Sequence, residues 1–172
     1  YQALLTNVAG ASSTAIGYQA MGNANSALNG NTPLITYNTA VGYQALQGSA
    51  TAASNTGNNN TAVGYQSMYN TVSGGNNVGI GIQTLFTNNN GYYNNAIGYQ
   101  TMYSNTSGQM NDAMGYQALY SVTTGNYNIG LGGYAGNGIT TGSNNTLIGY
   151  DADVTNTGLT NATAIGNQAS VD

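Results

Sequence analysis

Apolar and polar positions along the chain repeat at a nearly fixed interval. A glycine directly after an apolar residue recurs nine times, and from the third of these glycines onward the chain keeps a constant 17-residue period. The two earlier intervals, from Gly17 to Gly42 and from Gly42 to Gly64, fit the same unit carrying insertions of eight and five residues. This self-similarity predicts a repeat architecture with one structural coil per unit. The glycines at the regular interval, which we call the register glycines, are Gly64, Gly81, Gly98, Gly115, Gly132, Gly149 and Gly166.

Other positions keep the same register. An asparagine stands four residues before the register glycine, an apolar residue stands directly before it, and a small residue follows three positions later. The unit approximates N-x-A-I-G-Y-Q-A-L-Y-S-N-T-x-G-x-x. The asparagines of the regular units are Asn60, Asn77, Asn94, Asn111, Asn128 and Asn145. The apolar residues are Val63, Ile80, Ile97, Met114, Leu131, Ile148 and Ile165.

The unit favours strands over helices. Each of its two glycines would cost about 1 kcal/mol inside a helix, and Asn, Ser and Thr compete with helical hydrogen bonds. Strands of four or five residues between Gly and Asn turns fit better. Because so short a strand cannot bury its apolar face alone, successive units must stack. We therefore expect an all-β fold, a parallel β-solenoid or β-roll with about 17 residues per coil.

Stacking also accounts for the lack of charge. The 172 residues include four acidic side chains and no lysine, arginine or histidine. Equivalent residues of successive coils would lie about 4.8 Å apart, where like charges repel but Asn and Gln side chains can hydrogen-bond along a ladder. We expect the apolar row to form an interior stripe and the glycines to supply corner conformations closed to other residues.

The whole chain, residues 1–172, is expected to be a single repetitive segment. The leading "YQAL" adds the tail of a further copy, which gives about ten coils, with insertions near residues 22–35 and 48–56. The chain opens in mid-motif and neither end resembles a polar cap, so we expect a fragment of a longer fibre. The interior of such a coil is thin, and a homotrimer would bury more apolar surface than the alternative, a monomeric solenoid.

Three stretches carry a resemblance to known repeats: "NTAVGYQSMYN" (60–70), "NNAIGYQTMYSNTSG" (94–108) and "NATAIGNQAS" (161–170). They resemble the head repeats of trimeric autotransporter adhesins and, more closely, repeats in bacteriophage tail fibres. The resemblance implies a left-handed β-roll of three chains side by side that binds host surface components, with Ile16, Val41, Val63, Ile97 and Ile165 as core residues. The coil is longer than in adhesin heads, and "LGGYAG" (131–136) and Asp151 interrupt the Tyr-Gln pair.

Composition excludes several kinds of function. Without cations the chain cannot neutralise phosphates, so we expect no nucleic-acid partner. Without Cys or His it lacks the ligands of zinc, haem and iron–sulfur groups, so no cofactor is expected. No apolar run approaches the roughly 20 residues that span a bilayer, so we expect no membrane insertion. Without Glu or His we also expect no catalysis.

Three sets of residues are candidates for contacts. The paired carboxylates of Asp151 and Asp153, with Asn156, form a weak candidate calcium site, and the alternative is a solvated corner. An aromatic row could contact glycans or serve as a structural ladder. A threonine row could bind ice, although Thr suits any strand flank. The aromatic row is Tyr69, Phe86, Tyr103 and Tyr120, and the threonine row is Thr106, Thr123, Thr140 and Thr157.

A tyrosine row directly after the register glycine adjoins a glutamine row, and on a strand one of the two faces in and the other out. The insertion that contains Pro33 could make specific contacts or be a tolerated surface loop. We expect a non-enzymatic structural shaft or adhesin segment of an extracellular fibre, either a phage tail fibre or a bacterial appendage. Its partners would be copies of itself and a cell-surface glycan or protein. The alternatives are a carbohydrate-binding module and, less favoured, an ice-binding solenoid.

Overall fold

The chain folds into a row of very short parallel strands. The computed structural model describes residues 2–3, 12–23, 36–50 and 54–172. The strands in these ranges are β1 (Thr14–Ile16), β2 (Thr39–Val41), β3 (Thr61–Val63), β4 (Val78–Ile80), β5 (Asn95–Ile97), β6 (Asp112–Met114), β7 (Ile129–Leu131), β8 (Thr146–Ile148), β9 (Asp153–Val154), β10 (Thr163–Ile165) and β11 (Ser170–Val171).

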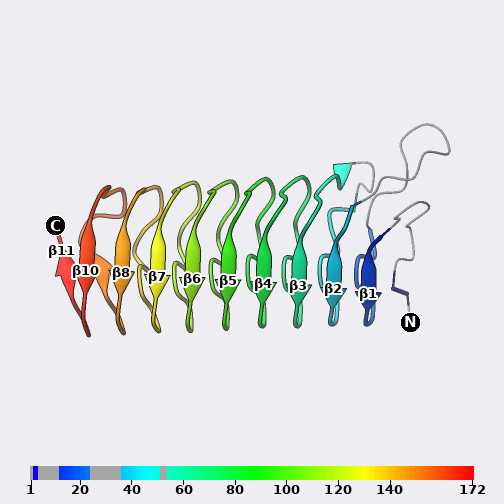
Figure 1. Cartoon of the computed structure of the whole chain (residues 1–172), viewed down its shortest axis with the longest axis horizontal. Coiled ribbons are helices and arrows are strands. Elements are labelled where there is room, and N and C mark those ends of the chain that lie inside the picture. Colours follow the sequence, from blue (N-terminus) through cyan, green and yellow to red (C-terminus); the bar gives the residue numbers. More distant parts are fainter. Residues whose placement is uncertain (1, 4–11, 24–35, 51–53) are drawn as a thin grey trace.

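One nine-stranded parallel sheet runs the length of the molecule, in the order β1-β2-β3-β4-β5-β6-β7-β8-β10 (Figure 1). Strands from successive coils pair in the register of the repeat, so Asn95 of β5 lies opposite Asp112 of β6. A second sheet, of β9 and β11, begins beside the last two coils. The predicted all-β parallel solenoid with its 17-residue coil is therefore confirmed.

The strands of the main sheet have three residues, shorter than the four or five that the sequence predicted. A register glycine ends each of them, and Gly98 has a φ of 135° that no strand residue adopts. On the other side of the strand, the chain turns at a residue in the left-handed region, such as Tyr93 with a φ of 59°. Each strand is thus confined between two corners.

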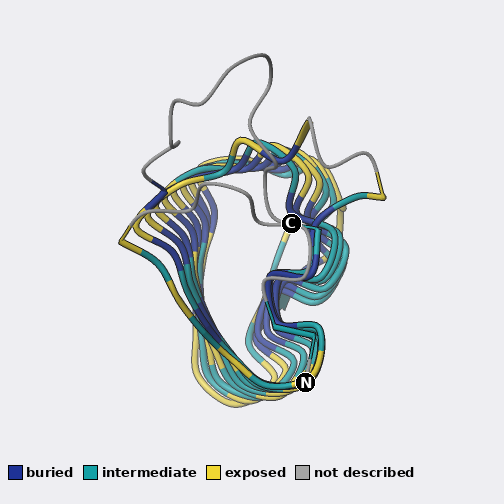
Figure 2. Cartoon of the chain, turned by 90° about the vertical axis from the view of Figure 1, so that its right-hand side faces the viewer, coloured by how far each residue is buried: buried dark blue, intermediate teal, exposed yellow. Residues whose placement is uncertain are grey.

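The interior is filled by small residues facing a single row of larger ones, and Figure 2 shows the buried segments recurring at the same places in successive coils. The middle strand residue points inward, as Ala96 does at 0% exposure. Opposite lie the residues four positions after the register glycine, such as Met68 and Leu119, which are also fully buried. The space between the two rows is small, because a Cβ added to Gly79 would lie 3.0 Å from Cγ of Met68.

The apolar row directly before the register glycine is not the interior stripe that the sequence predicted. Since the middle residue of each three-residue strand faces in, its neighbours on either side must face out. Ile165 is 66% exposed and Met114 is 52% exposed. The prediction of a core position was therefore wrong for Ile16, Val41, Val63, Ile80, Ile97, Met114, Leu131, Ile148 and Ile165, which are all exposed or half-buried.

The asparagine ladder is confirmed. Asn94 is fully buried, and its Oδ1 accepts hydrogen bonds from the backbone N–H and Nδ2 of Asn111, at 3.0 and 3.1 Å. Its own Nδ2 donates to the carbonyl of Gly108 at 2.8 Å. The same pattern joins Asn60, Asn77, Asn111, Asn128 and Asn145 in adjacent coils. Each side chain therefore ties its coil to the next and to the corner of its own.

Candidate functional surface

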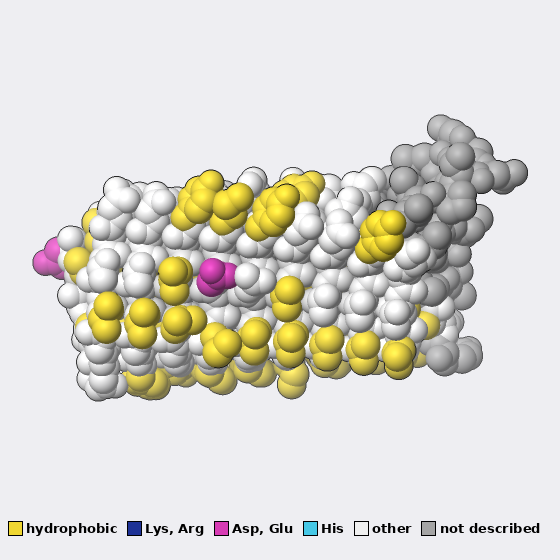
Figure 3. Space-filling model, in the orientation of Figure 1, with side chains coloured by type: hydrophobic (Ala, Val, Ile, Leu, Met, Phe, Trp, Pro, Cys, Tyr) yellow, Lys and Arg dark blue, Asp and Glu magenta, His cyan; other side chains and the backbone are white. Residues whose placement is uncertain are grey.

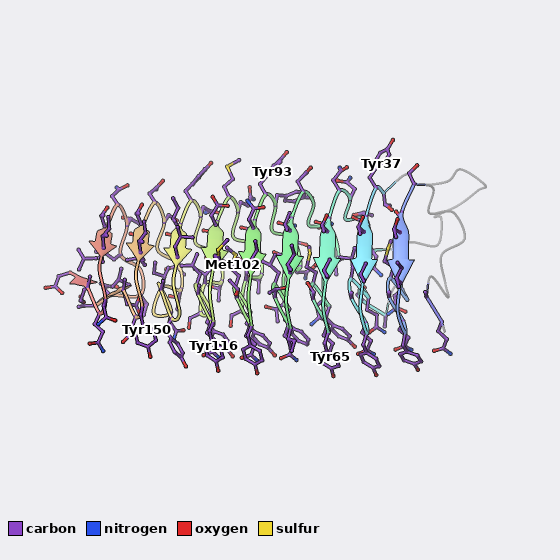
Figure 4. All side chains as sticks on the ribbon, turned by 60° about the horizontal axis from the view of Figure 1, so that its bottom comes forward. Tyr37, Tyr65, Tyr93, Met102, Tyr116 and Tyr150 are labelled. Atoms are coloured by element: carbon purple, nitrogen blue, oxygen red, sulfur yellow. The ribbon has the colours of Figure 1, made fainter. Side chains whose placement is uncertain are left out.

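Two rows along the outer side of the sheet are apolar, and a third row, at the first strand position, is mostly polar, as at Thr61, Asn95 and Asp112. The row directly before the register glycine and the tyrosine row directly after it both point outward, one on each side of the glycine. Tyr65 is 46% exposed and Tyr116 is 47% exposed, and Figure 4 shows both on the same edge of the molecule as Tyr150. Figure 3 shows hydrophobic side chains in a nearly unbroken line along this edge. A continuous apolar surface of this kind marks a site of association in soluble proteins.

Neighbouring tyrosines of the row after the register glycine stack on one another, at one end of the molecule and, with Tyr99 and Tyr116, in its middle. The rings of Tyr18 and Tyr43 lie 5.2 Å apart, as do those of Tyr43 and Tyr65, with interplanar angles of 14° and 8°. The pattern changes at Tyr134, whose ring meets that of Tyr116 at 63°. The sequence signals this change, since Gly133 takes the tyrosine's place and the tyrosine moves one residue on.

The glutamine row forms a second ladder beside the tyrosines. Nε2 of Gln100 donates to Oε1 of Gln83 at 3.0 Å, and Nε2 of Gln117 donates to Oε1 of Gln100 at 2.8 Å. The side chains are half-buried, whereas the neighbouring tyrosines are exposed. The structure thus decides between the two orientations left open by the sequence: the tyrosines face out, and the glutamines lie along the wall.

The second aromatic row, which the sequence singled out for glycan contact, is stacked face to face. Ring centroids lie 5.2 Å apart for Tyr69 and Phe86, 5.0 Å for Phe86 and Tyr103, and 5.3 Å for Tyr103 and Tyr120. All four side chains are half-buried. Because their faces cover one another, these rings offer mainly edges to solvent, and this geometry favours the structural-ladder interpretation.

The threonine row is engaged in similar internal bonding. Oγ1 of Thr106 donates to the carbonyl of Thr123 at 3.0 Å, Thr123 donates to Thr140 at 3.1 Å, and Thr140 donates to Thr157 at 3.3 Å. Each hydroxyl thus uses its one proton on the neighbouring coil, so no hydroxyl proton of these three residues is left to donate to ice. A local structural role explains the regular row.

The candidate calcium residues make bonds to the backbone. The two carboxylate oxygens of Asp153 accept N–H groups of Gly138 and Val154, each at 2.8 Å. Burial raises the pKa of this carboxyl, and those two N–H groups offset part of the rise. Asp151 is an exposed corner residue, and Oδ1 of Asn156 accepts the N–H of Gly158 at 3.0 Å. Among the residues described, no three acidic side chains are grouped closely enough to hold a metal.

The predicted contact loop around Pro33 lies outside the described residues, as does most of the insertion near residues 22–35 and part of that near 48–56. At the edge of the second insertion, Asn55 is buried and its Oδ1 accepts the N–H of Ser49 at 2.9 Å. This bond joins the two described ends of the loop.

A corner row that sequence reasoning missed holds exposed apolar side chains. It lies five residues before the register glycine, where four coils use asparagine: Asn59, Asn76, Asn144 and Asn161. Other coils place Tyr37, Tyr93, Met110 and Tyr127 there. Figure 4 shows Tyr37 and Tyr93 on the edge opposite the tyrosine row. The signal that could have revealed this row is the exchange of asparagine for bulky residues at a constant position of the unit.

Comparison of the chain with protein-family models, with curated proteins and with solved structures found no match. Within the described ranges, the structure contains no helix of the length and apolar character that crossing a bilayer requires.

Proposed function

We propose that the chain is a non-enzymatic structural segment of an extracellular fibre, and that its copies associate side by side through the outer apolar face. The observation that carries this proposal is the exposure of the most regular apolar row in the sequence. A row kept apolar in nine successive coils, yet turned away from the interior, is hard to explain unless another surface covers it.

A second copy of the chain is the natural occupant of this face. Both surfaces would then be apolar and would share one axial spacing of about 4.8 Å per coil, so side chains of one copy could fit between those of another. Closed cyclic assemblies leave no such face exposed. We propose a homotrimer in particular, supported by the resemblance to the repeats of trimeric adhesins and tail fibres.

The role of a shaft follows from the way the coils are joined. Asparagine, glutamine and threonine side chains each bond to the next coil, so every coil is linked to its neighbours by several independent ladders. Uncharged ladders of this kind are insensitive to salt and pH, because there is almost no charge to screen or titrate. Such a construction suits a rod that holds a binding group away from a surface.

The test is to break the outer face without touching the core. The double variant Ile80→Thr, Met114→Thr places β-branched residues on two strands and removes apolar side chains from the face. Light scattering should give a mass about three times the 17.5 kDa of one chain for the unmodified protein, and the mass of one chain for the variant. Tyr37→Asn, on the opposite edge, is the matched control and should leave the mass unchanged.

Two results would contradict the proposal. A single-chain mass for the unmodified protein at micromolar concentration would exclude association. Images of a globular particle in place of a rod would exclude the shaft, whatever the mass.

A further inference from the structure

Three consecutive coils place bulky side chains in a conformation that costs free energy. Tyr93, Met110 and Tyr127 have φ angles of 59°, 54° and 57°. The left-handed region costs most L-residues about 1 kcal/mol or more, and Asn, which other coils use at this corner, tolerates it best. The backbone bonds of the coil impose this conformation, since the N–H of Met110 donates to the carbonyl of Tyr92 at 3.0 Å.

The strained side chains recover little of this cost inside the chain. Tyr93 is 53% exposed, Met110 is 43% exposed and Tyr127 is 55% exposed. The rings of the other two aromatic rows stack on one another, whereas the ring of Tyr93 meets only that of Tyr92, at 6.4 Å and a tilt of 43°, within the described residues. Other left-handed residues of the coil are compensated inside the chain, as Gln100 is by the glutamine ladder and Met102 by full burial. The exposed side chains of Tyr93 and Tyr127 lack such compensation, which points to a contact with a separate molecule.

A carboxylate lies two residues from the central side chain of this row. Met110 and Asp112 flank the buried Asn111, so their side chains both point outward. Met110 stands between Tyr93 of the coil before and Tyr127 of the coil after, at a coil spacing of about 4.8 Å, and the neighbours of Asp112 itself in those two coils are Asn95 and Ile129. Figure 3 shows an acidic group in the middle of the molecule, directly below hydrophobic side chains of the upper edge.

The charge of Asp112 is not balanced by any cation of the chain. Its Oδ1 accepts one hydrogen bond, at 2.7 Å from Nδ2 of the neighbouring Asn95, and the side chain is exposed. The sequence holds no lysine, arginine or histidine and has a formal net charge of −4. Tyrosine faces attract ammonium and guanidinium groups, and a carboxylate pairs with the same groups.

We propose that Tyr93, Met110, Asp112 and Tyr127 form a binding site for a lysine- or arginine-bearing segment of a partner protein. The cation lies against the carboxylate of Asp112, and the row of Tyr93, Met110 and Tyr127 contacts the aliphatic stem of the side chain. A second copy of these residues cannot be the partner, because it carries no basic side chain. Tyr93 lies on the edge opposite the tyrosine row (Figure 4), and Asp112, which leaves β6 on the same side as Met114, lies between that edge and the apolar row.

The test is a titration of the whole chain with an acetylated hexalysine peptide at low ionic strength, followed through the tyrosine-ring signals by nuclear magnetic resonance. The rings of Tyr93 and Tyr127 should shift. Asp112→Asn, Tyr93→Asn and Tyr127→Asn should each weaken binding about fivefold, the effect of losing one exposed ion pair or cation–π contact. The tyrosine variants introduce the residue that other coils use at this corner, so the fold is retained.

Matched controls separate the site from net charge. Tyr37→Asn changes the same corner position, 57% exposed, in a coil without an acidic neighbour. Asp151→Asn removes one charge elsewhere, and neither control should change the affinity. Equal weakening by Asp112→Asn and Asp151→Asn, or no shift at Tyr93 and Tyr127, would overturn the proposal. So would a neutral oligosaccharide that shifts the same signals and binds Asp112→Asn unchanged.

Discussion

At the scale of single residues, the structure explains why the chain can do without charge. Asn94 makes one bond to its own corner and accepts two from the next coil, all in a fully buried position. An aspartate there would lose the donor and bury a charge beside others like it, which costs several kcal/mol. Amide side chains both donate and accept, so an identical copy in every coil satisfies the next.

The register glycines are required for two reasons: the backbone of the next coil approaches them closely, and their φ angles are positive. A Cβ on Gly98 would lie 2.4 Å from the carbonyl oxygen of Gly115, and the residue has a φ of 135°. We predict that Gly98→Ala lowers the free energy of unfolding by roughly 2–4 kcal/mol, because the next coil must move away and the backbone is strained. Urea denaturation followed by circular dichroism measures this loss.

The control is a glycine directly beside a register glycine. A Cβ on Gly133 would meet its nearest atom, Cδ2 of Tyr150, at 3.4 Å, an ordinary contact. Gly133→Ala should therefore leave stability unchanged or raise it by up to about 1 kcal/mol through the less flexible unfolded chain. Equal losses for the two variants would contradict the assignment of a special role to the register glycines.

At the scale of the strand and its coil, the sequence predicts which strands pair with one another. It does not predict which side chains of a strand face the interior. A fixed period aligns equivalent residues, so the partners of each strand follow directly. A strand of three residues, however, gives too few positions to show which side is buried. The small Ala96 is buried because the interior is thin, and the larger Ile97 faces out, contrary to the usual expectation for apolar side chains.

One coil contains a signal that could have revealed this orientation. Leu147 replaces alanine at the middle of β8, and the coil before it has Gly136 where all earlier coils have leucine or methionine. A Cβ on Gly136 would lie 2.9 Å from Cδ1 of Leu147, so the two positions share one space. Exchange of large for small between them shows that both face the interior. The corner row was missed because its position holds asparagine in some coils and tyrosine or methionine in others, so no single residue type recurs there.

The strand β9 provides a prediction of pH dependence. Burial raises the pKa of Asp153 above its ordinary value of 3.8, and the charge of Asp151 raises it further. The folded chain then binds the proton more tightly than the unfolded chain, so the free energy of unfolding should fall as pH rises through the interval between the two pKa values. It should stay at the lower level up to neutral pH.

Urea denaturation at pH values from about 3 to 7 measures this decline. Asp153→Asn should flatten it, because the titrating group is gone. The side chain of Asp112 is exposed, so the variant Asp112→Asn should show the same decline as the unmodified chain. Stability that rises over the same interval in the unmodified chain would contradict the role given to Asp153.

At the scale of the whole molecule, the coils form a one-dimensional series with different edges. The tyrosine row runs along one edge and Tyr93 of the corner row lies on the other (Figure 4), with Asp112 on the face between them. The two proposed contacts therefore centre on opposite edges. One fits association between like chains, and the other fits a partner of opposite charge, which these residues cannot supply themselves.

Because each coil contacts only its neighbours, a whole coil should be removable. Deletion of residues 78–94 removes one complete repeat and joins Asn77 to Asn95, so that β3 pairs directly with β5 in the register of the repeat. We predict a folded rod that is shorter by about 4.8 Å, with one cooperative unfolding transition.

Deletion of residues 78–93, one residue fewer, displaces every later side chain by one position and turns buried residues outward. Small-angle scattering and thermal circular dichroism should then show a folded, shortened rod for the first deletion and loss of structure for the second. Equal tolerance of the two deletions would mean that the 17-residue register does not determine the stack.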